Sequence, residues 1–142
     1  MICIIRISGD VKIREHSRET LRRLGLTRKY SCIILEKPTK VELGMLKDVK
    51  DLVAFGELDT GTYKELVEKR GYKPKKTKTQ PNTNYKKEMR QVFRLHPPRG
   101  GINTKQHYSL ENGNVKRGVL GNHGNKINEL VRKMLWLQLT QY

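Results

Sequence analysis

The residue types from which catalytic and metal sites are usually built are scarce in this sequence. Among its 142 residues are two cysteines, Cys3 and Cys32, and four histidines. The histidines have no CxxC or HExxH companions, so no metal site is expected. Both cysteines lie in apolar, strand-like runs, which predicts buried, reduced thiols and a cytoplasmic protein.

Acidic side chains are rare after residue 71, where only Glu88, Glu111 and Glu129 occur. Paired carboxylates for acid–base catalysis are therefore not expected in this half. No Ser-His-Asp or Cys-His set stands out, and the glycines of residues 97–101 and 121–126 do not precede a Lys-Ser/Thr pair as in a phosphate-binding loop. We predict that the chain is no enzyme and has no cofactor and no small-molecule substrate.

Long hydrophobic runs are also missing. No apolar stretch approaches the roughly 20 residues of a membrane span. Met1 leads directly into "ICIIRI", without a basic start or a small-residue cleavage site, so no secretory signal is expected. Apolar residues make up 35% of the chain, which predicts a modest core and one domain, or one domain with an extension.

Basic residues, in contrast, are abundant and unevenly placed. The net charge is +16, from 30 Lys and Arg against 14 Asp and Glu. Residues 1–59 carry 12 basic and 9 acidic side chains, residues 60–71 carry 3 and 2, and residues 72–142 carry 15 and 3. This excess indicates an anionic partner, nucleic acid first and an anionic membrane surface second. We expect a self-sufficient first half and a second half that depends on its partner for its shape.

The first half alternates strand and helix patterns. Strands are predicted at 1–7, 31–36 and 52–58, where β-branched and apolar residues cluster. One helix is predicted near 17–24, capped by Ser17 or starting earlier near Arg14, and ended by Gly25. A second, at 39–51, has Val41, Leu43, Leu46 and Val49 at near-helical spacing. The β-α-β-α-β order predicts an α+β fold, with two helices on one face of a three-stranded sheet.

The second half begins with a helix predicted at 59–70, capped by Asp59, Thr60 or Thr62, with Tyr63, Leu66 and Val67 on one face. Residues 73–90 have too few apolar groups to build a core and are expected to be extended or disordered without a partner. A turn is expected at Asn112-Gly113. A C-terminal amphipathic helix is predicted at 122–136, because Ile127, Leu130, Val131, Met134 and Leu135 follow helical spacing.

The loop "RLHPPRGG", residues 94–101, is stiff, cationic and irregular. Prolines fix its path, glycines allow close backbone approach, and arginine can bind a phosphate or stack on a base. It therefore resembles a phosphate-contacting loop, although a surface turn with an incidental arginine has the same composition. The lysines of residues 73–87 are typical of RNA contacts, or of a solvated linker or localisation signal. Tyr72, Tyr85 and Tyr108 could stack on bases, whereas core packing is expected for Phe93 and packing on the last helix for Trp136.

Three motifs, "LVEKRGY", "FRLHPPRGG" and "LGNHGNKINELVRKML", occur in an order that resembles the long archaeal form of the large-subunit ribosomal protein L30 family, called L7 in eukaryotes. The resemblance spans most of residues 1–136. It implies a ferredoxin-like core at 1–58 with an antiparallel three-stranded sheet and a central first strand, followed by a basic extension at 59–142. It further implies a structural role on large-subunit rRNA, beside neighbouring ribosomal proteins, without catalysis. The archaeal form is favoured because the chain begins at the first strand.

These motifs and charged segments together predict RNA contacts through phosphates and shape. A basic nuclease and a free regulatory RNA- or DNA-binding module remain the alternatives. The predicted contact residues are Lys69, Arg70, Lys73, Lys75, Lys76, Lys78, Lys86, Lys87, Arg90, Arg94, Pro98, Arg99, Gly100, Gly101, Lys105, Lys116, Arg117, Asn122, Lys126, Arg132 and Lys133.

Overall fold

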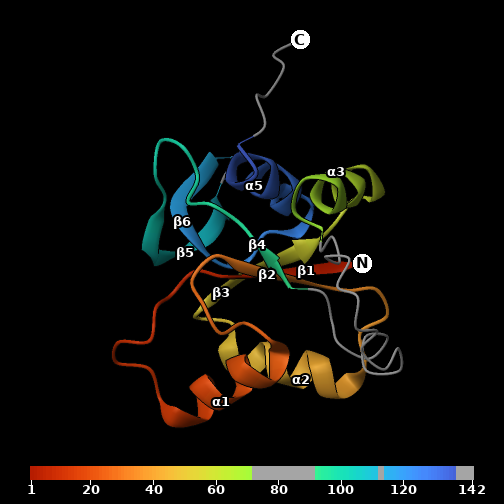
Figure 1. Cartoon of the computed structure of the whole chain (residues 1–142). Coiled ribbons are helices and arrows are strands. Elements are labelled where there is room, and N and C mark those ends of the chain that lie inside the picture. Colours follow the sequence, from red (N-terminus) through yellow and green to blue (C-terminus); the bar gives the residue numbers. More distant parts are fainter. Residues whose placement is uncertain (72–91, 112–113, 137–142) are drawn as a thin grey trace, which may run out of the picture.

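A computed structural model describes residues 1–71, 92–111 and 114–136 of the chain. Its elements are a mixture of helices and strands around one sheet (Figure 1). In chain order they are β1 (Ile2–Arg6), α1 (Glu15–Leu24), β2 (Ser31–Leu35), α2 (Lys40–Val49), β3 (Val53–Glu57), α3 (Thr60–Arg70), β4 (Phe93–Arg94), β5 (Asn103–Glu111), β6 (Asn114–Asn122), the 3₁₀ turn η1 (Gly124–Lys126) and α5 (Ile127–Met134).

The sheet of these strands has the order β4-β2-β1-β3-β6-β5. Strand β1 lies between β2 and β3 and is antiparallel to both, which confirms the predicted α+β unit and its central first strand. The sheet has six strands rather than three, so the predicted size was wrong. Strand β4 extends it beside β2, while β6 joins β3 in parallel and β5 pairs with β6.

Helices α1 and α2 cover one face of the sheet, as predicted (Figure 1). Alternate side chains of β1 point to opposite faces, so Ile4 packs on this side and Cys3 and Ile5 on the other. Leu21 and Leu24 of α1 are buried here, together with Leu26 after that helix and residues from α2 and the strands: Ile33, Leu35, Leu46, Val49 and Val53.

The opposite face is covered by α3 and α5, which the sequence did not predict to lie there (Figure 1). The second half of the chain supplies much of this apolar cluster: Phe93, Leu95, Val119, Leu120, Ile127, Leu130, Val131, Met134 and Leu135. The described residues from 92 to 136 therefore have more apolar packing than their composition suggested. That this half depends on a partner for its shape stays a prediction. The division at residue 58 stays a prediction, because a shared sheet does not show whether residues 1–58 fold alone.

Helix ends follow local chemistry in most places. Helix α1 begins after Arg14 rather than at Ser17, and Gly25 ends it with φ of 86°, a conformation that glycine adopts easily. Thr39 and Glu42 form a reciprocal capping box on α2. Asp59 caps α3. The predicted inner face of α2 was partly wrong, because Val41 is 73% exposed.

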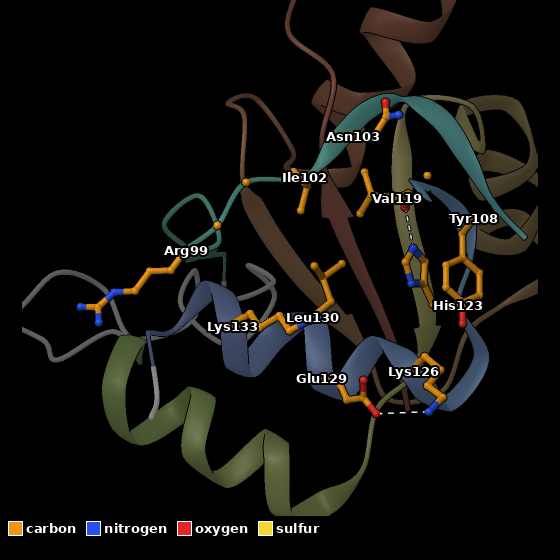
Figure 2. Close-up of a pocket in the computed structure, with 13 residues that line it drawn as sticks. Arg99, Ile102, Asn103, Tyr108, Val119, His123, Lys126, Glu129, Leu130 and Lys133 are labelled. Atoms are coloured by element: carbon orange, nitrogen blue, oxygen red, sulfur yellow. Dashed lines mark hydrogen bonds and ion pairs between the residues drawn. The ribbon is translucent and has the colours of Figure 1, made fainter. Parts of the chain in front are cut away.

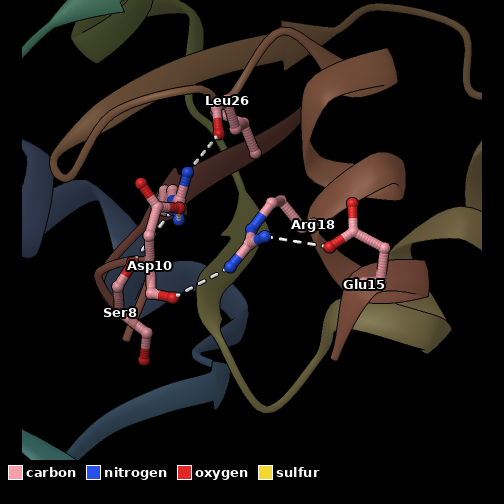
Figure 3. A network of polar contacts seen from close by, with 6 residues as sticks. Ser8, Asp10, Glu15, Arg18 and Leu26 are labelled. Carbon is pink, nitrogen blue, oxygen red and sulfur yellow. Dashed lines mark hydrogen bonds and ion pairs between the residues drawn. The ribbon is translucent and has the colours of Figure 1, made fainter. Parts of the chain in front are cut away.

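A buried arginine at the end of β1 holds the turn that follows this strand. Arg6 is only 2% exposed, and its guanidinium donates to the carbonyl oxygens of Ser8 and Leu26 and to the carboxylate of Asp10 (Figure 3). The arginine holds the pKa of the Asp10 carboxyl below its usual range. Arg18 of α1 donates to the Asp10 carbonyl, so the network ties the 8–10 turn to the helix.

The two cysteines are buried and free, as predicted, with their sulfur atoms 3.2 Å apart. Burial and the neighbouring Cys3 raise the pKa of the Cys32 thiol. These side chains fill the sheet core as small apolar groups. In the described parts of the chain, no helix is long and apolar enough to cross a membrane.

Candidate nucleic-acid interface

An open pocket of about 910 Å³ lies between the 99–101 loop, the β5–β6 pair and α5 (Figure 2). Ile102, Val119 and Leu130 supply apolar lining and point toward one another across it. Asn103 adds an amide at the upper edge. Such a pocket, apolar inside with a few polar groups, has the size of many ligand sites.

The rim of this pocket is basic. Arg99, Lys126 and Lys133 line it, against one carboxylate, Glu129. Lys126 and Glu129 form an ion pair of 3.3 Å, and both side chains are more than half exposed. The rim therefore keeps a net positive charge and attracts anions.

Two glycines at the same rim leave the backbone accessible. Gly100 and Gly101 have φ of 86° and 77°, which disfavour any side chain, and a Cβ on either would meet no protein atom within 4 Å. Free space thus borders this backbone. The close approach of a partner to these glycines stays a prediction.

The loop of residues 94–101 is held by the end of α5. The indole nitrogen of Trp136 donates to the Pro97 carbonyl at 2.9 Å, and its ring stacks on His96 at 4.4 Å between centroids. The Arg99 guanidinium lies 5.2 Å from the Trp136 ring centroid, within cation–π range. Trp136 has a φ of 57°, in the left-handed region, and is 43% exposed. The tryptophan thus orders the cationic loop and positions its arginine.

An aromatic pair forms the wall of the pocket at β5 and β6. The rings of Tyr108 and His123 stack at 4.1 Å, and His123 lies between Tyr108 and Val119 (Figure 2). His123 Nε2 donates to the Val119 carbonyl. Burial lowers the pKa of His123 below its usual value of 6.5, and the hydrogen bond to Val119 opposes this only in part. The imidazole is therefore neutral near pH 7, and this wall carries no charge.

The start of α5 is fixed against β3 by close packing and an asparagine. A Cβ on Gly56 would overlap the Gly124 carbonyl and lie 2.9 Å from the Cβ of Ile127, so only glycine fits there. The Asn128 side chain accepts from the Asp59 amide at 2.8 Å and donates to the carbonyl of Glu57 at 3.3 Å. These contacts set the position of the basic helix relative to the sheet.

The structure brings five of the predicted contact residues together around the pocket: Arg99, Gly100, Gly101, Lys126 and Lys133. Others lie elsewhere. Arg132 pairs with Glu65 of α3 at 3.2 Å, and Pro98 is buried and shapes the loop. Lys69 and Arg70 occupy the last turn of α3, Arg94 and Lys105 are exposed on β4 and β5, and the Asn122 side chain accepts from the Gly124 amide.

Several predicted positions fall outside the described residues: Lys73, Lys75, Lys76, Lys78, Lys86, Lys87 and Arg90, with Tyr72, Tyr85 and the Asn112-Gly113 turn. Lys116 and Arg117 belong to β6 by their backbone, and their side chains are outside the described part. Phe93 is 2% exposed, which confirms its predicted core role.

Sequence reasoning missed Ile102, Asn103 and Val119 as pocket residues, and it missed the contact of Trp136 with the loop. Their side chains meet only because β5 and β6 pair, and the polar strands gave little sign of this. The Asn-Gly pair at 112–113 was the available signal, since such pairs often join hairpin strands. Within the described ranges, no group of three or more His, Cys, Asp or Glu side chains could hold a metal ion.

Comparison with known proteins identifies relatives over nearly the whole chain. The family model for ribosomal protein L30p/L7e matches residues 2–53. Large ribosomal subunit protein uL30 of Archaeoglobus fulgidus is 35% identical, covering 94% of this chain and 99% of that protein. The proteins of the same name from Methanosphaera stadtmanae and Methanocella arvoryzae are 33% and 32% identical, over 95% and 94% of this chain and 100% and 99% of their own. The predicted family is thereby confirmed: this chain belongs to the ribosomal protein L30p/L7e family.

Proposed function

We propose that the chain is a structural constituent of the large ribosomal subunit that binds large-subunit rRNA and supports its folding and assembly. The observation that carries this proposal is the basic rim of one pocket, which Arg99, Lys126 and Lys133 line together with two open glycines. The family is one of structural ribosomal proteins rather than enzymes, and the names of the archaeal relatives support the same particle.

The proposed mechanism is phosphate neutralisation combined with shape recognition. Each lysine or arginine that neutralises a phosphate releases counterions, so affinity falls steeply as salt rises. The loop, η1 and α5 present their charges from a packed framework, which lowers the ordering cost of binding. Contacts of the lysines at 73–87 and of neighbouring ribosomal proteins belong to this proposal, as does a cytoplasmic location within the ribosome.

Salt-dependent binding to large-subunit rRNA tests the proposal. Changing Arg94, Arg99 and the lysines of 73–87 to neutral residues should weaken binding and flatten the plot of log affinity against log salt. Each lost phosphate contact should reduce the slope by about 0.7–0.9. A variant with Lys40 and Lys47 neutralised is the control, because both lie on α2, across the sheet from the pocket. Wild-type affinity and slope in the multiple variant would contradict the mechanism.

Sedimentation of a cell extract separates a ribosomal constituent from a free regulatory module. The chain should travel with the large subunit in a one-to-one ratio and stay bound through a high-salt wash. A chain found only in the unbound fractions would refute the ribosomal assignment, even if it binds purified RNA.

A further inference from the structure

We propose that the pocket between the 99–101 loop, β5–β6 and α5 takes one base unstacked from the rRNA, with its phosphates on the basic rim. This inference rests on the proposed function and adds the class of ligand group and its place. Single-stranded and bulged RNA is recognised in this way, through splayed bases on aromatic and apolar surfaces.

The inner surface suits a heterocycle better than a phosphate. Ile102, Val119 and Leu130 give an apolar lining, and the stacked His123 adds a flat aromatic group beside Val119. A phosphate placed there would lose its hydration without a cation to replace it. A base loses little on entering such a lining and gains dispersion and stacking contacts.

The rim, by contrast, suits the backbone of the same nucleotide. Lys126 and Lys133 line the pocket from η1 and α5. Arg99 lies on the loop opposite, and its guanidinium points away from the pocket, within 5.2 Å of the Trp136 ring centroid (Figure 2). Space beside Gly100 and Gly101 is free, so a sugar–phosphate chain can pass close to the loop. The Asn103 amide donates to Gln106 and accepts from the Lys105 amide, which fixes it at the edge where the polar edge of a base would lie. This division into an apolar interior and a cationic rim favours RNA over an apolar side chain of another protein, which needs no cations.

Replacing Ile102 by tryptophan tests the inference, because it fills the pocket without changing a charge. Ile102 is half-buried and lies just before β5. Against naked large-subunit rRNA, I102W should bind about tenfold more weakly or worse, as loss of one stacked base predicts, with an unchanged salt slope. Chemical probing of base edges should show one nucleotide that the wild type protects and the variant leaves reactive. The matched control, I102V, keeps the lining and should retain both affinity and protection.

The outcomes are distinguishable. I102W with wild-type affinity and protection overturns the inference while the proposed function stands. A defect of I102W seen only in assembled subunits, with naked rRNA bound normally, also overturns it and assigns the pocket to a neighbouring protein. If the wild type shows no salt-dependent rRNA binding, the proposed function fails and the inference with it. If I102W loses its cooperative unfolding transition, I102F, which adds less volume, takes its place in the measurements of rRNA affinity and base protection.

Discussion

The Trp136→Ala substitution removes three contacts that hold the loop of residues 94–101. The indole hydrogen bond to Pro97 is partly solvated and contributes about 0.5–1.5 kcal/mol. Stacking on His96 adds about 0.5–1.5 kcal/mol, and the cation–π contact with Arg99 about 0.5–1 kcal/mol at such an exposed site. Since these contacts share one half-exposed ring, we expect the free energy of unfolding to fall by about 2 kcal/mol.

The backbone of Trp136 provides an internal comparison. Its φ of 57° is costly for alanine as well as tryptophan, whereas glycine adopts it freely. Trp136→Gly should therefore be at least as stable as Trp136→Ala, although glycine in a regular helix is about 1 kcal/mol worse than alanine. Urea denaturation of the three proteins measures both differences.

The same substitution separates loop order from charge in RNA binding. W136A keeps every cation, so its salt slope should equal that of the wild type, while its affinity falls about five- to tenfold because the loop must be ordered on binding. R99M should instead reduce the slope by about 0.7–0.9. Hydrogen exchange at the Gly101 amide, which donates to Pro98, reports loop order in the free protein. If W136A matches the wild type in unfolding, exchange and affinity, the loop does not depend on the tryptophan.

Three further substitutions test the packing and the buried polar groups. Gly56→Ala should lower the free energy of unfolding by about 1–3 kcal/mol or more, because its Cβ would overlap the Gly124 carbonyl; thermal unfolding would show this, and an unchanged midpoint would contradict the close packing. Arg6→Met should cost about 1–3 kcal/mol, since the Leu26 carbonyl loses its buried donor; a stability equal to wild type in urea would refute that role. Because the pKa of His123 is lowered in the folded state, the unfolded chain binds more protons once the pH drops below 6.5, so stability should fall as the pH decreases from that value. His123→Phe should lose that part of the pH dependence. If the stability of the variant and of the wild type changes with pH in the same way, His123 does not contribute to it.

The first half of the fold was predictable because its signals are local. Apolar β-branched runs identify β1 and β2, and Gly25 ends α1 as its chemistry requires. The error in α2 is of another kind. Val41 and Leu43 were predicted on the inner face with Leu46 and Val49, but they are 73% and 37% exposed, so near-helical spacing alone did not identify the buried face.

The β5–β6 pair could not be predicted from periodicity. Its sequences, "NTKQHYSLE" and "NVKRGVLGN", have no regular alternation, and the register shifts on either side of His107. The strands form through tertiary pairing, since β6 runs parallel to β3 and the His123 amide donates to the Phe55 carbonyl at 2.8 Å. Gly118 permits this, because a Cβ there would overlap the β5 backbone at Gln106 and His107. The pocket could not be predicted for the same reason, because its lining depends on the pairing of β5 with β6.

The charge of the second half and its apolar core do not conflict, because they occupy different faces of the same elements. In η1 and α5, Ile127, Val131 and Met134 are fully buried while Lys126 and Lys133 remain exposed. A count of charges along the chain does not distinguish the buried apolar face from the exposed charged face. It therefore led to the prediction that the second half depends on a partner for its shape. A helix with an apolar inner face gains order from its packing on the sheet. In the proposed binding to rRNA, this packing lowers the entropy cost of ordering α5, so the helix presents a fixed geometry to the RNA.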